Sequence, residues 1–214
     1  MDNYKEKFEK IYKNQGEAPW TFKEIPKELK ELIETKKIKP GKVLEIGCGE
    51  GYAAIYLASK GFKVEALDRS KRAIGYAKEH AKEEGANCSF LIMDYKDIDK
   101  INKEFDFILD WRFLHEIIGE KERKKYVKNI HRLLANGGKY VSASFSGESD
   151  YWGTGKIRKA PTDIKLYFGK LENLKQLFEP YFEIIEMKLI KVPEKPDMEV
   201  DANYFFMEKG YEKK

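Results

Sequence analysis

The chain has 214 residues, of which 42% are hydrophobic and 36% are charged, so we expect a single domain with a sizeable core. Its formal net charge of +4 is spread along the chain without a block of like charges, which makes nucleic acid a poor candidate partner. No apolar run approaches the roughly 18 residues of a membrane span, and the polar N-terminus lacks the apolar segment of a signal peptide.

The cysteines and the charged residues add expectations about location. Cys48 and Cys88 have neither a metal-ligand nor a redox spacing, so we expect two free thiols in a reducing compartment and no metal site. We therefore expect a cytoplasmic protein that does not enter a membrane. Lysine and glutamate dominate the charged residues, which weakly favours a thermophilic source.

The hydrophobic pattern predicts helices and strands that alternate along most of the chain. Helices are expected over 3–13 and 26–37, the second opened by Pro26. The remaining elements, in chain order, are strand 42–46, helix 51–60, strand 62–67, helix 71–84 with Ser70 as N-cap, strand 88–93, strand 105–109, helix 120–134, a turn at 136–138, strand 139–145, a loop over 146–167, helix 170–178, strand 182–190, a connection marked by Pro193 and Pro196, and strand 203–207.

This alternation predicts a parallel sheet with helices on both faces. The last two strands follow each other without a helix, so we expect them to pair antiparallel at one edge. We divide the single domain 1–214 into an N-terminal helical cap (1–40), a cofactor-binding core (41–145), a substrate-side loop (146–170) and a terminal helix with its strand pair (171–214).

A glycine-rich loop follows the first strand of the core. That strand ends just after Glu45, and Gly47, Gly49 and Gly51 follow at alternate positions. Glycines let the backbone turn sharply and approach a ligand, while Asp68 at the end of the next strand can accept hydrogen bonds from ribose hydroxyls. The spacing differs from the Gly-x-Gly-x-x-Gly that places a helix N-terminus at a dinucleotide pyrophosphate. A cofactor with an amino-acid end fits better, because Glu45 can fix its ammonium group.

Acidic residues also end the third and fourth strands of the core. The pairs Asp68-Arg69, Asp94-Tyr95 and Asp110-Trp111 follow three successive strands. Because ligands bind outside the carboxyl ends of parallel strands, we expect these residues to gather around one cleft.

The segments Val43–Gly51 and Phe105–Ile117 resemble the class I S-adenosylmethionine-dependent methyltransferases, and are most similar to the small-molecule enzymes of the thiopurine and tellurite-resistance type. The resemblance implies a three-layer α/β, Rossmann-like fold whose seven-stranded, mostly parallel sheet has the order 3-2-1-4-5-7-6 with the last strand antiparallel. It implies S-adenosylmethionine as cofactor and S-adenosylhomocysteine as product. The residues it assigns to cofactor binding are Trp20, Glu45, Gly47, Cys48, Gly49, Gly51, Asp68, Arg69, Asp94, Tyr95, Asp110 and Trp111.

Two residues are candidates for catalysis. Asp110 can orient cofactor or substrate, or it can simply cap the turn that follows. His115 can take a proton from a hydroxyl or thiol, or it can be a structural histidine that bonds to the backbone. The candidate substrate contacts are Tyr12, Trp111, Arg112, His115, Trp152 and Arg158.

We therefore expect methyl transfer to a small-molecule acceptor by a monomer or homodimer, with a thiol or another soft nucleophile slightly preferred. The fourth strand lacks the Asn-Pro-Pro-Tyr motif of enzymes that methylate base amines, and the chain has too few cysteines for arsenite methylation. Two alternatives stay open: a methyltransferase acting on RNA or protein, and a nucleotide-binding module of the dehydrogenase type.

Overall fold

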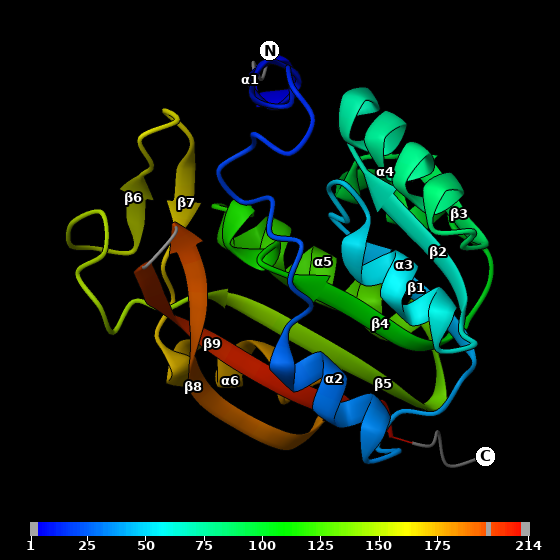
Figure 1. Cartoon of the computed structure of the whole chain (residues 1–214). Coiled ribbons are helices and arrows are strands. Elements are labelled where there is room, and N and C mark those ends of the chain that lie inside the picture. Colours follow the sequence, from blue (N-terminus) through cyan, green and yellow to red (C-terminus); the bar gives the residue numbers. More distant parts are fainter. Residues whose placement is uncertain (1–3, 196–197, 211–214) are drawn as a thin grey trace.

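The computed structural model describes residues 4–195 and 198–210, and its centre is a seven-stranded sheet (Figure 1). The strands lie in the order β3-β2-β1-β4-β5-β9-β8, which confirms the predicted order 3-2-1-4-5-7-6. Strand β9 pairs antiparallel with both β5 and β8, and the other strand pairs of this sheet are parallel. The strands are β1 (Lys42–Ile46), β2 (Lys63–Asp68), β3 (Cys88–Ile92), β4 (Phe105–Trp111), β5 (Leu134–Phe145), β8 (Glu183–Lys195) and β9 (Met198–Glu208).

Helices cover both faces of the sheet, so the predicted three layers are present (Figure 1). One face packs its alternate strand residues against α2 (Lys27–Glu34), α3 (Tyr52–Ser59) and α4 (Lys71–Glu83). The opposite face packs against α5 (Glu120–Leu133) and α6 (Leu171–Phe178). Two short 3₁₀ helices that we did not predict, η1 (Tyr95–Lys100) and η2 (Leu114–Glu116), follow β3 and β4.

Local signals set the ends of several elements. The Ser70 hydroxyl accepts a hydrogen bond from the Ala73 amide at 3.1 Å, so Ser70 is the predicted N-cap of α4. Gly85 follows the helix with a positive φ of 62°, a conformation that glycine adopts without strain.

The start of β5 differs from the prediction. We expected a turn over 136–138 and a strand from 139, but the strand begins directly after α5 at Leu134. The Gly137 amide donates to the Lys209 carbonyl, and the Lys209 amide donates to the Gly138 carbonyl, both at 2.9 Å. Pairing with a segment about 70 residues away therefore extends the strand through the predicted turn.

The C-terminal third also departs from the prediction. Residues 146–167, expected as a loop, contain a two-stranded sheet of β6 (Ile157–Lys159) and β7 (Lys165–Tyr167). Strand β8 continues through Pro193 instead of ending at residue 190, and β9 begins before residue 203. A proline is tolerated there because β8 lies at the edge of the sheet, where its missing N–H breaks no ladder. Pro196 lies outside the described residues.

The N-terminal helix α1 (Tyr4–Ile11) and the segment after it lie across the carboxyl ends of the strands (Figure 1). Within the described residues, no helix is long and apolar enough to cross a membrane. The division of the chain at residues 40, 145 and 170 stays a prediction.

Candidate functional site

A cleft of about 440 Å³ opens at the carboxyl ends of the central strands, below the N-terminal segment. Most of the residues predicted for the site line this cleft. They are Tyr12, Trp20, Glu45, Gly47, Cys48, Gly49, Asp68, Arg69, Tyr95, Trp111, Arg112, His115 and Trp152. Four predicted residues are not part of its lining: Gly51, Asp94, Asp110 and Arg158.

The glycine loop forms one end of the cleft. The Gly47 and Cys48 amides donate to the Leu67 carbonyl at 2.8 and 3.0 Å, which ties the loop to β2. Gly47 has a φ of 71°, and a Cβ there would lie 2.4 Å from the Phe113 ring. Only glycine fits this position, and the bare backbone leaves room for a ligand beside it.

Glu45 presents an unsatisfied carboxylate oxygen at this end. The residue is 5% exposed, and its Oε2 has no hydrogen-bond partner among the described residues. Burial raises the pKa of its carboxyl group to about 8. A buried oxygen without a partner carries a desolvation cost, which the ammonium group of an amino-acid ligand would offset.

Asp68 lies on the neighbouring wall and is held by the backbone. Its Oδ2 accepts a hydrogen bond from the Gly49 amide at 3.0 Å, and its Oδ1 accepts one from the Ser70 amide at 2.8 Å. Burial raises the pKa of this carboxyl group, whereas the Ser70 and Gly49 amides and the Arg69 charge lower it. These two amides fix the orientation of the carboxylate, as a ribose-binding group requires.

Asp94, which the resemblance assigns to cofactor binding, lies beside the cleft, but its carboxylate is already paired. Its Oδ2 accepts hydrogen bonds from Arg69 at 2.6 and 3.1 Å, and its Oδ1 caps η1 through the Lys96 amide. Tyr95 reaches the cleft and makes an edge-to-face contact with Phe113 at 5.7 Å between ring centres. Gly51 has a packing role, because a Cβ there would lie 2.9 Å from both Ala77 and Phe90.

Asp110 does not face the cleft, which corrects the expectation that it lies at the transfer site. The side chain is fully buried on the α5 side of the sheet, where it accepts hydrogen bonds from Tyr126 at 2.8 Å, Ser142 at 2.6 Å and Tyr140. Burial raises the pKa of its carboxyl group to about 7, against the effect of these three hydroxyls. The geometry is that of a satisfied core carboxyl group.

His115 lines the cleft but is not placed as a strong base. Its Nδ1 accepts a hydrogen bond from the Phe145 amide at 3.3 Å, and its ring stacks on Phe145 at 4.2 Å. Burial and the nearby Arg112 charge hold the pKa of the imidazole well below its usual range. The ring is therefore neutral near pH 7, and the bond to Nδ1 assigns its proton to Nε2.

Aromatic side chains from the N-terminal segment cover the cleft. The Trp20 indole donates to the Tyr12 hydroxyl at 2.6 Å, and the Trp20 ring packs against Phe8 at 5.4 Å. Tyr12 stands over the glycine loop, 3.0 Å from where a Cβ on Gly49 would lie. Glu50 fastens this cover by accepting hydrogen bonds from the Gly16 amide at 2.9 and 3.2 Å.

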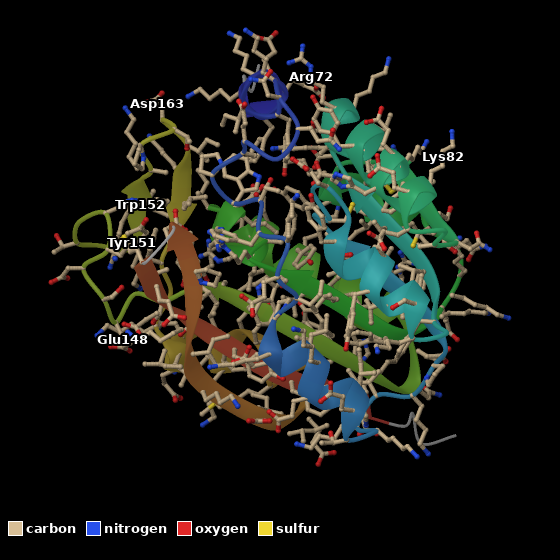
Figure 2. The ribbon with its side chains drawn as sticks, viewed as in Figure 1. Arg72, Lys82, Glu148, Tyr151, Trp152 and Asp163 are labelled. Carbon is tan, nitrogen blue, oxygen red and sulfur yellow. The ribbon has the colours of Figure 1, made fainter. Side chains whose placement is uncertain are left out.

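Ionic contacts fasten α1 at both sides of the opening. Lys7 pairs with Asp163 of the β6–β7 turn at 2.8 Å, and Glu9 pairs with Arg72 of α4 at 3.9 Å. Figure 2 shows α1 between the labelled Asp163 and Arg72. The N-terminal segment thus bridges the two walls of the cleft.

The other end of the cleft lies between β4, β5, the β6–β7 pair and the β8–β9 hairpin. Arg112 pairs with Glu194 of β8 at 2.5 Å, and Trp152 packs edge-to-face on Phe145 at 5.7 Å. The labelled Tyr151 and Trp152 lie on this side of the molecule (Figure 2). Arg158 lies outside the cleft and donates to the carbonyls of Ser149, Tyr151 and Gly155, so it orders the loop instead of contacting a ligand.

Sequence reasoning missed several cleft residues, including Phe22, Glu50, Glu116 and Glu194. Glu50 lies inside the glycine motif and Glu116 follows His115, so their positions next to predicted site residues could have identified them from the sequence. Phe22 and Glu194 belong to distant segments that carry no motif. Among the described residues, no group of three histidine, cysteine or acidic side chains is arranged to hold a metal ion.

The fold and this cleft define an α/β protein whose glycine loop and strand-end acids suit a nucleoside-containing cofactor with an amino-acid end. Residues 43–138 match the family described as a methyltransferase domain. This match covers somewhat less than half of the chain, and together with the fold and the relatives below it supports a class I S-adenosylmethionine-dependent methyltransferase, a family whose cofactor is S-adenosylmethionine.

Among the proteins similar to this chain are two relatives and one solved structure. A 2-heptyl-1-hydroxyquinolin-4(1H)-one methyltransferase of Mycobacteroides abscessus is 32% identical over 67% of this chain. A ubiquinone biosynthesis O-methyltransferase of Coxiella burnetii is 30% identical over 53% of it. The matches span 66% and 47% of the lengths of these relatives.

The solved structure is the 1,6-didemethyltoxoflavin-N1-methyltransferase of Burkholderia thailandensis with bound 1,6-didemethyltoxoflavin and S-adenosylhomocysteine. It has a TM-score of 0.76 at 21% identity, and the alignment covers 97% of this chain and 87% of that one. At this sequence identity, the similarity is evidence that the two proteins share a fold, and of nothing further.

Proposed function

We propose that the protein transfers a methyl group from S-adenosylmethionine to a small molecule. The observation that carries the proposal is the buried Glu45 oxygen without a partner, beside the glycine loop and Asp68. Glu45 would hold the cofactor's ammonium group, and Asp68 would hold its ribose. The bound cofactor supplies an electrophilic methyl group on a sulfonium, so the chain's own task is to hold the nucleophile in line with it.

The acceptor is an atom that ionises without help from the protein. His115 is a weak base with its Nδ1 already bonded to the backbone, and Asp110 lies in the core. A thiol or an acidic hydroxyl needs no strong base near neutral pH, whereas an ordinary alcohol does. This supports our preference for a thiol or another easily ionised nucleophile.

The cleft favours a small planar acceptor over a macromolecule. Phe22, Trp111, Phe145 and Trp152 form aromatic walls, and the N-terminal segment covers the opening. The lining of the cleft also includes Glu24, Glu28 and Glu199 beside Lys27 and Lys191, so the cleft lacks the predominantly basic surface that an RNA substrate needs. The Mycobacteroides abscessus relative is named for a hydroxyquinolinone, which is a planar acceptor of this kind.

Calorimetric titration with S-adenosylmethionine, S-adenosylhomocysteine, NAD and NADH tests the cofactor. We expect micromolar binding of the first two alone; binding of the nicotinamide pair, or of none, contradicts the proposal. A screen of thiols, acidic phenols, N-hydroxy heterocycles and small amines for S-adenosylhomocysteine release then tests the acceptor. Faster release with amines than with thiols or acidic hydroxyls contradicts the preferred acceptor class.

A monomeric or homodimeric state, a cytoplasmic location and a thermophilic source stay predictions. Cys48 and Cys88 are both free thiols in the structure, as the sequence predicts.

A further inference from the structure

A buried ion pair lies at the end of the cleft away from the glycine loop, which we call the acceptor end, and forms its floor. The Arg112 side chain is 9% exposed and Glu194 is 4% exposed, and Arg112 Nη2 donates to Glu194 Oε2 at 2.5 Å. Arg112 Nη1 donates to the Pro193 carbonyl at 2.9 Å. The guanidinium lies over two cleft rings, 5.0 Å from the centre of Phe22 and 5.1 Å from that of Phe145.

One donor of this guanidinium is left without a partner. Arg112 Nε is buried and makes no hydrogen bond to any described residue. Arg112 also has a φ of 61°, a left-handed conformation that is strained for a residue with a side chain. An unsatisfied buried donor and backbone strain at one residue are typical of a group preorganised for a ligand.

A second donor lies beside the first. Because Nδ1 of His115 accepts from the Phe145 amide, its Nε2 carries the proton, and no described residue accepts that hydrogen bond. His115 and Arg112 both contact the Phe145 ring, and both line the cleft. Two donors at one aromatic wall suit an oxygen atom with two lone pairs.

The charge of Glu194 decides which kind of oxygen fits. The Arg112–Glu194 pair is neutral as a unit, so a carboxylate bound there would meet the Glu194 carboxylate without a free positive charge. A neutral carbonyl oxygen accepts the same hydrogen bonds without that repulsion. The aromatic walls around it favour a ring that stacks.

We propose that Arg112 and His115 bind the carbonyl oxygen of a planar cyclic acceptor, and that Glu194 makes this subsite select a neutral carbonyl oxygen over a carboxylate at this position of the ring. The inference rests on the proposed function and names its substrate class. In this arrangement Arg112 and His115 position the ring, and the atom that receives the methyl group is a separate nucleophile on it.

The test is calorimetric binding of three probes to the protein saturated with S-adenosylhomocysteine, so that no turnover is needed. The probes are quinolin-4(1H)-one, quinoline and quinoline-4-carboxylate. The cost of a lost partner at a buried donor predicts that the quinolinone binds about 10-fold or more tightly than quinoline. We expect the carboxylate to bind more weakly than the quinolinone.

Two variants locate the effect. Removing Arg112 alone would leave Glu194 buried without its cation, so the double variant R112M/E194Q removes both charges. We expect its preference for the quinolinone over quinoline to shrink to about threefold or less. The single variant E194Q keeps the Arg112 guanidinium but removes the carboxylate that neutralises it. Binding of the probe quinoline-4-carboxylate should therefore tighten by about 10-fold.

The matched control is R132Q, because Arg132 also donates to two carbonyls, those of Ile98 and Ile101, but lies outside the cleft lining. It should keep the wild-type order of affinities. Unchanged binding of S-adenosylhomocysteine shows that each variant is folded; should the double variant not fold, E194Q alone decides.

Equal affinity of the wild type for quinolinone and quinoline would overturn the inference, as would an unchanged carboxylate affinity in E194Q. If S-adenosylhomocysteine binds but none of the three probes does, the inference is also overturned, while the proposed cofactor stands. Failure to bind S-adenosylhomocysteine would instead defeat the proposed function.

Discussion

Asp68, the last residue of β2, lies on the wall of the cleft, whereas Asp110, one residue before the end of β4, lies in the core on the other face of the sheet. The register explains the difference. Glu45 of β1 lies opposite Leu109 of β4, so these two side chains share a face, and the next residue, Asp110, points to the opposite one. Asp68 lies two residues beyond Ala66, which also pairs with Glu45, so it shares the face of Glu45. A difference of one position in the register therefore gives the two aspartates different surroundings.

The two ends of the cleft differ in a similar way. The glycine-loop end, which we call the cofactor end, is built from neighbouring strands and the loop between them, and hydrogen bonds such as that from the Gly49 amide to Asp68 join residues close in sequence. The acceptor end joins Arg112 to Glu194, which is 82 residues away. Local chemistry therefore shapes the cofactor end, and long-range packing shapes the acceptor end.

The largest expected effect concerns Asp110. Replacing it with alanine leaves the hydroxyls of Tyr126, Tyr140 and Ser142 buried without their common acceptor, so we expect D110A to lower the free energy of unfolding by about 3–5 kcal/mol. Urea unfolding measures the change. The control S142A removes one of the three hydroxyls and should cost clearly less. A loss below about 1 kcal/mol in D110A would contradict the core role.

The pH dependence of stability also tests the burial of Asp110 in the core. Asp110 has a pKa of about 7 in the folded protein, above the value of about 3.9 for an unfolded chain. The folded state binds this proton more tightly, so the stabilisation is complete below about pH 4 and is lost as pH rises through 7. The variant D110N has no carboxyl group to titrate at this position, so it lacks this pH-dependent contribution to the free energy of unfolding. The stability of the wild type relative to D110N should fall between pH 4 and pH 8, and a constant difference would refute the assignment.

The next effect is on cofactor affinity. D68A should weaken S-adenosylhomocysteine binding by about 1.5–3 kcal/mol, roughly 10- to 150-fold, because charge-assisted hydrogen bonds to the ribose are lost. Calorimetry measures this directly. D163N, which alters the fastening of α1 outside the cleft lining, serves as the comparison variant. An unchanged dissociation constant in folded D68A would remove Asp68 from the site.

The smallest effect is expected for D163N itself. The Lys7–Asp163 pair is exposed, and such pairs contribute little because water screens them. We expect the S-adenosylhomocysteine dissociation constant to change by no more than about twofold at moderate salt. A change of about 10-fold, measured by calorimetry at low and high salt, would instead make this pair a determinant of cofactor retention.

The sequence alone predicted the fold class and which residues gather at the glycine-loop end of the cleft, and the family resemblance supplied the strand order. Alternating hydrophobic patterns and the glycine loop act over short distances, so they can be read along the chain. Glu45, Gly47 and Asp68 lie in the cleft as predicted. The placement of Asp110 could not be predicted, because a strand buried on both faces has a continuous apolar pattern that does not reveal which side each residue faces.

Only the tertiary structure decided the acceptor end. The extension of β5 depends on pairing with Lys209, and the β6–β7 pair and the Arg112–Glu194 floor form between distant segments without motifs of their own. Nothing local in the sequence marks Phe22 or Glu194 as cleft residues. Their positions follow from packing and register, which are properties of the folded chain as a whole.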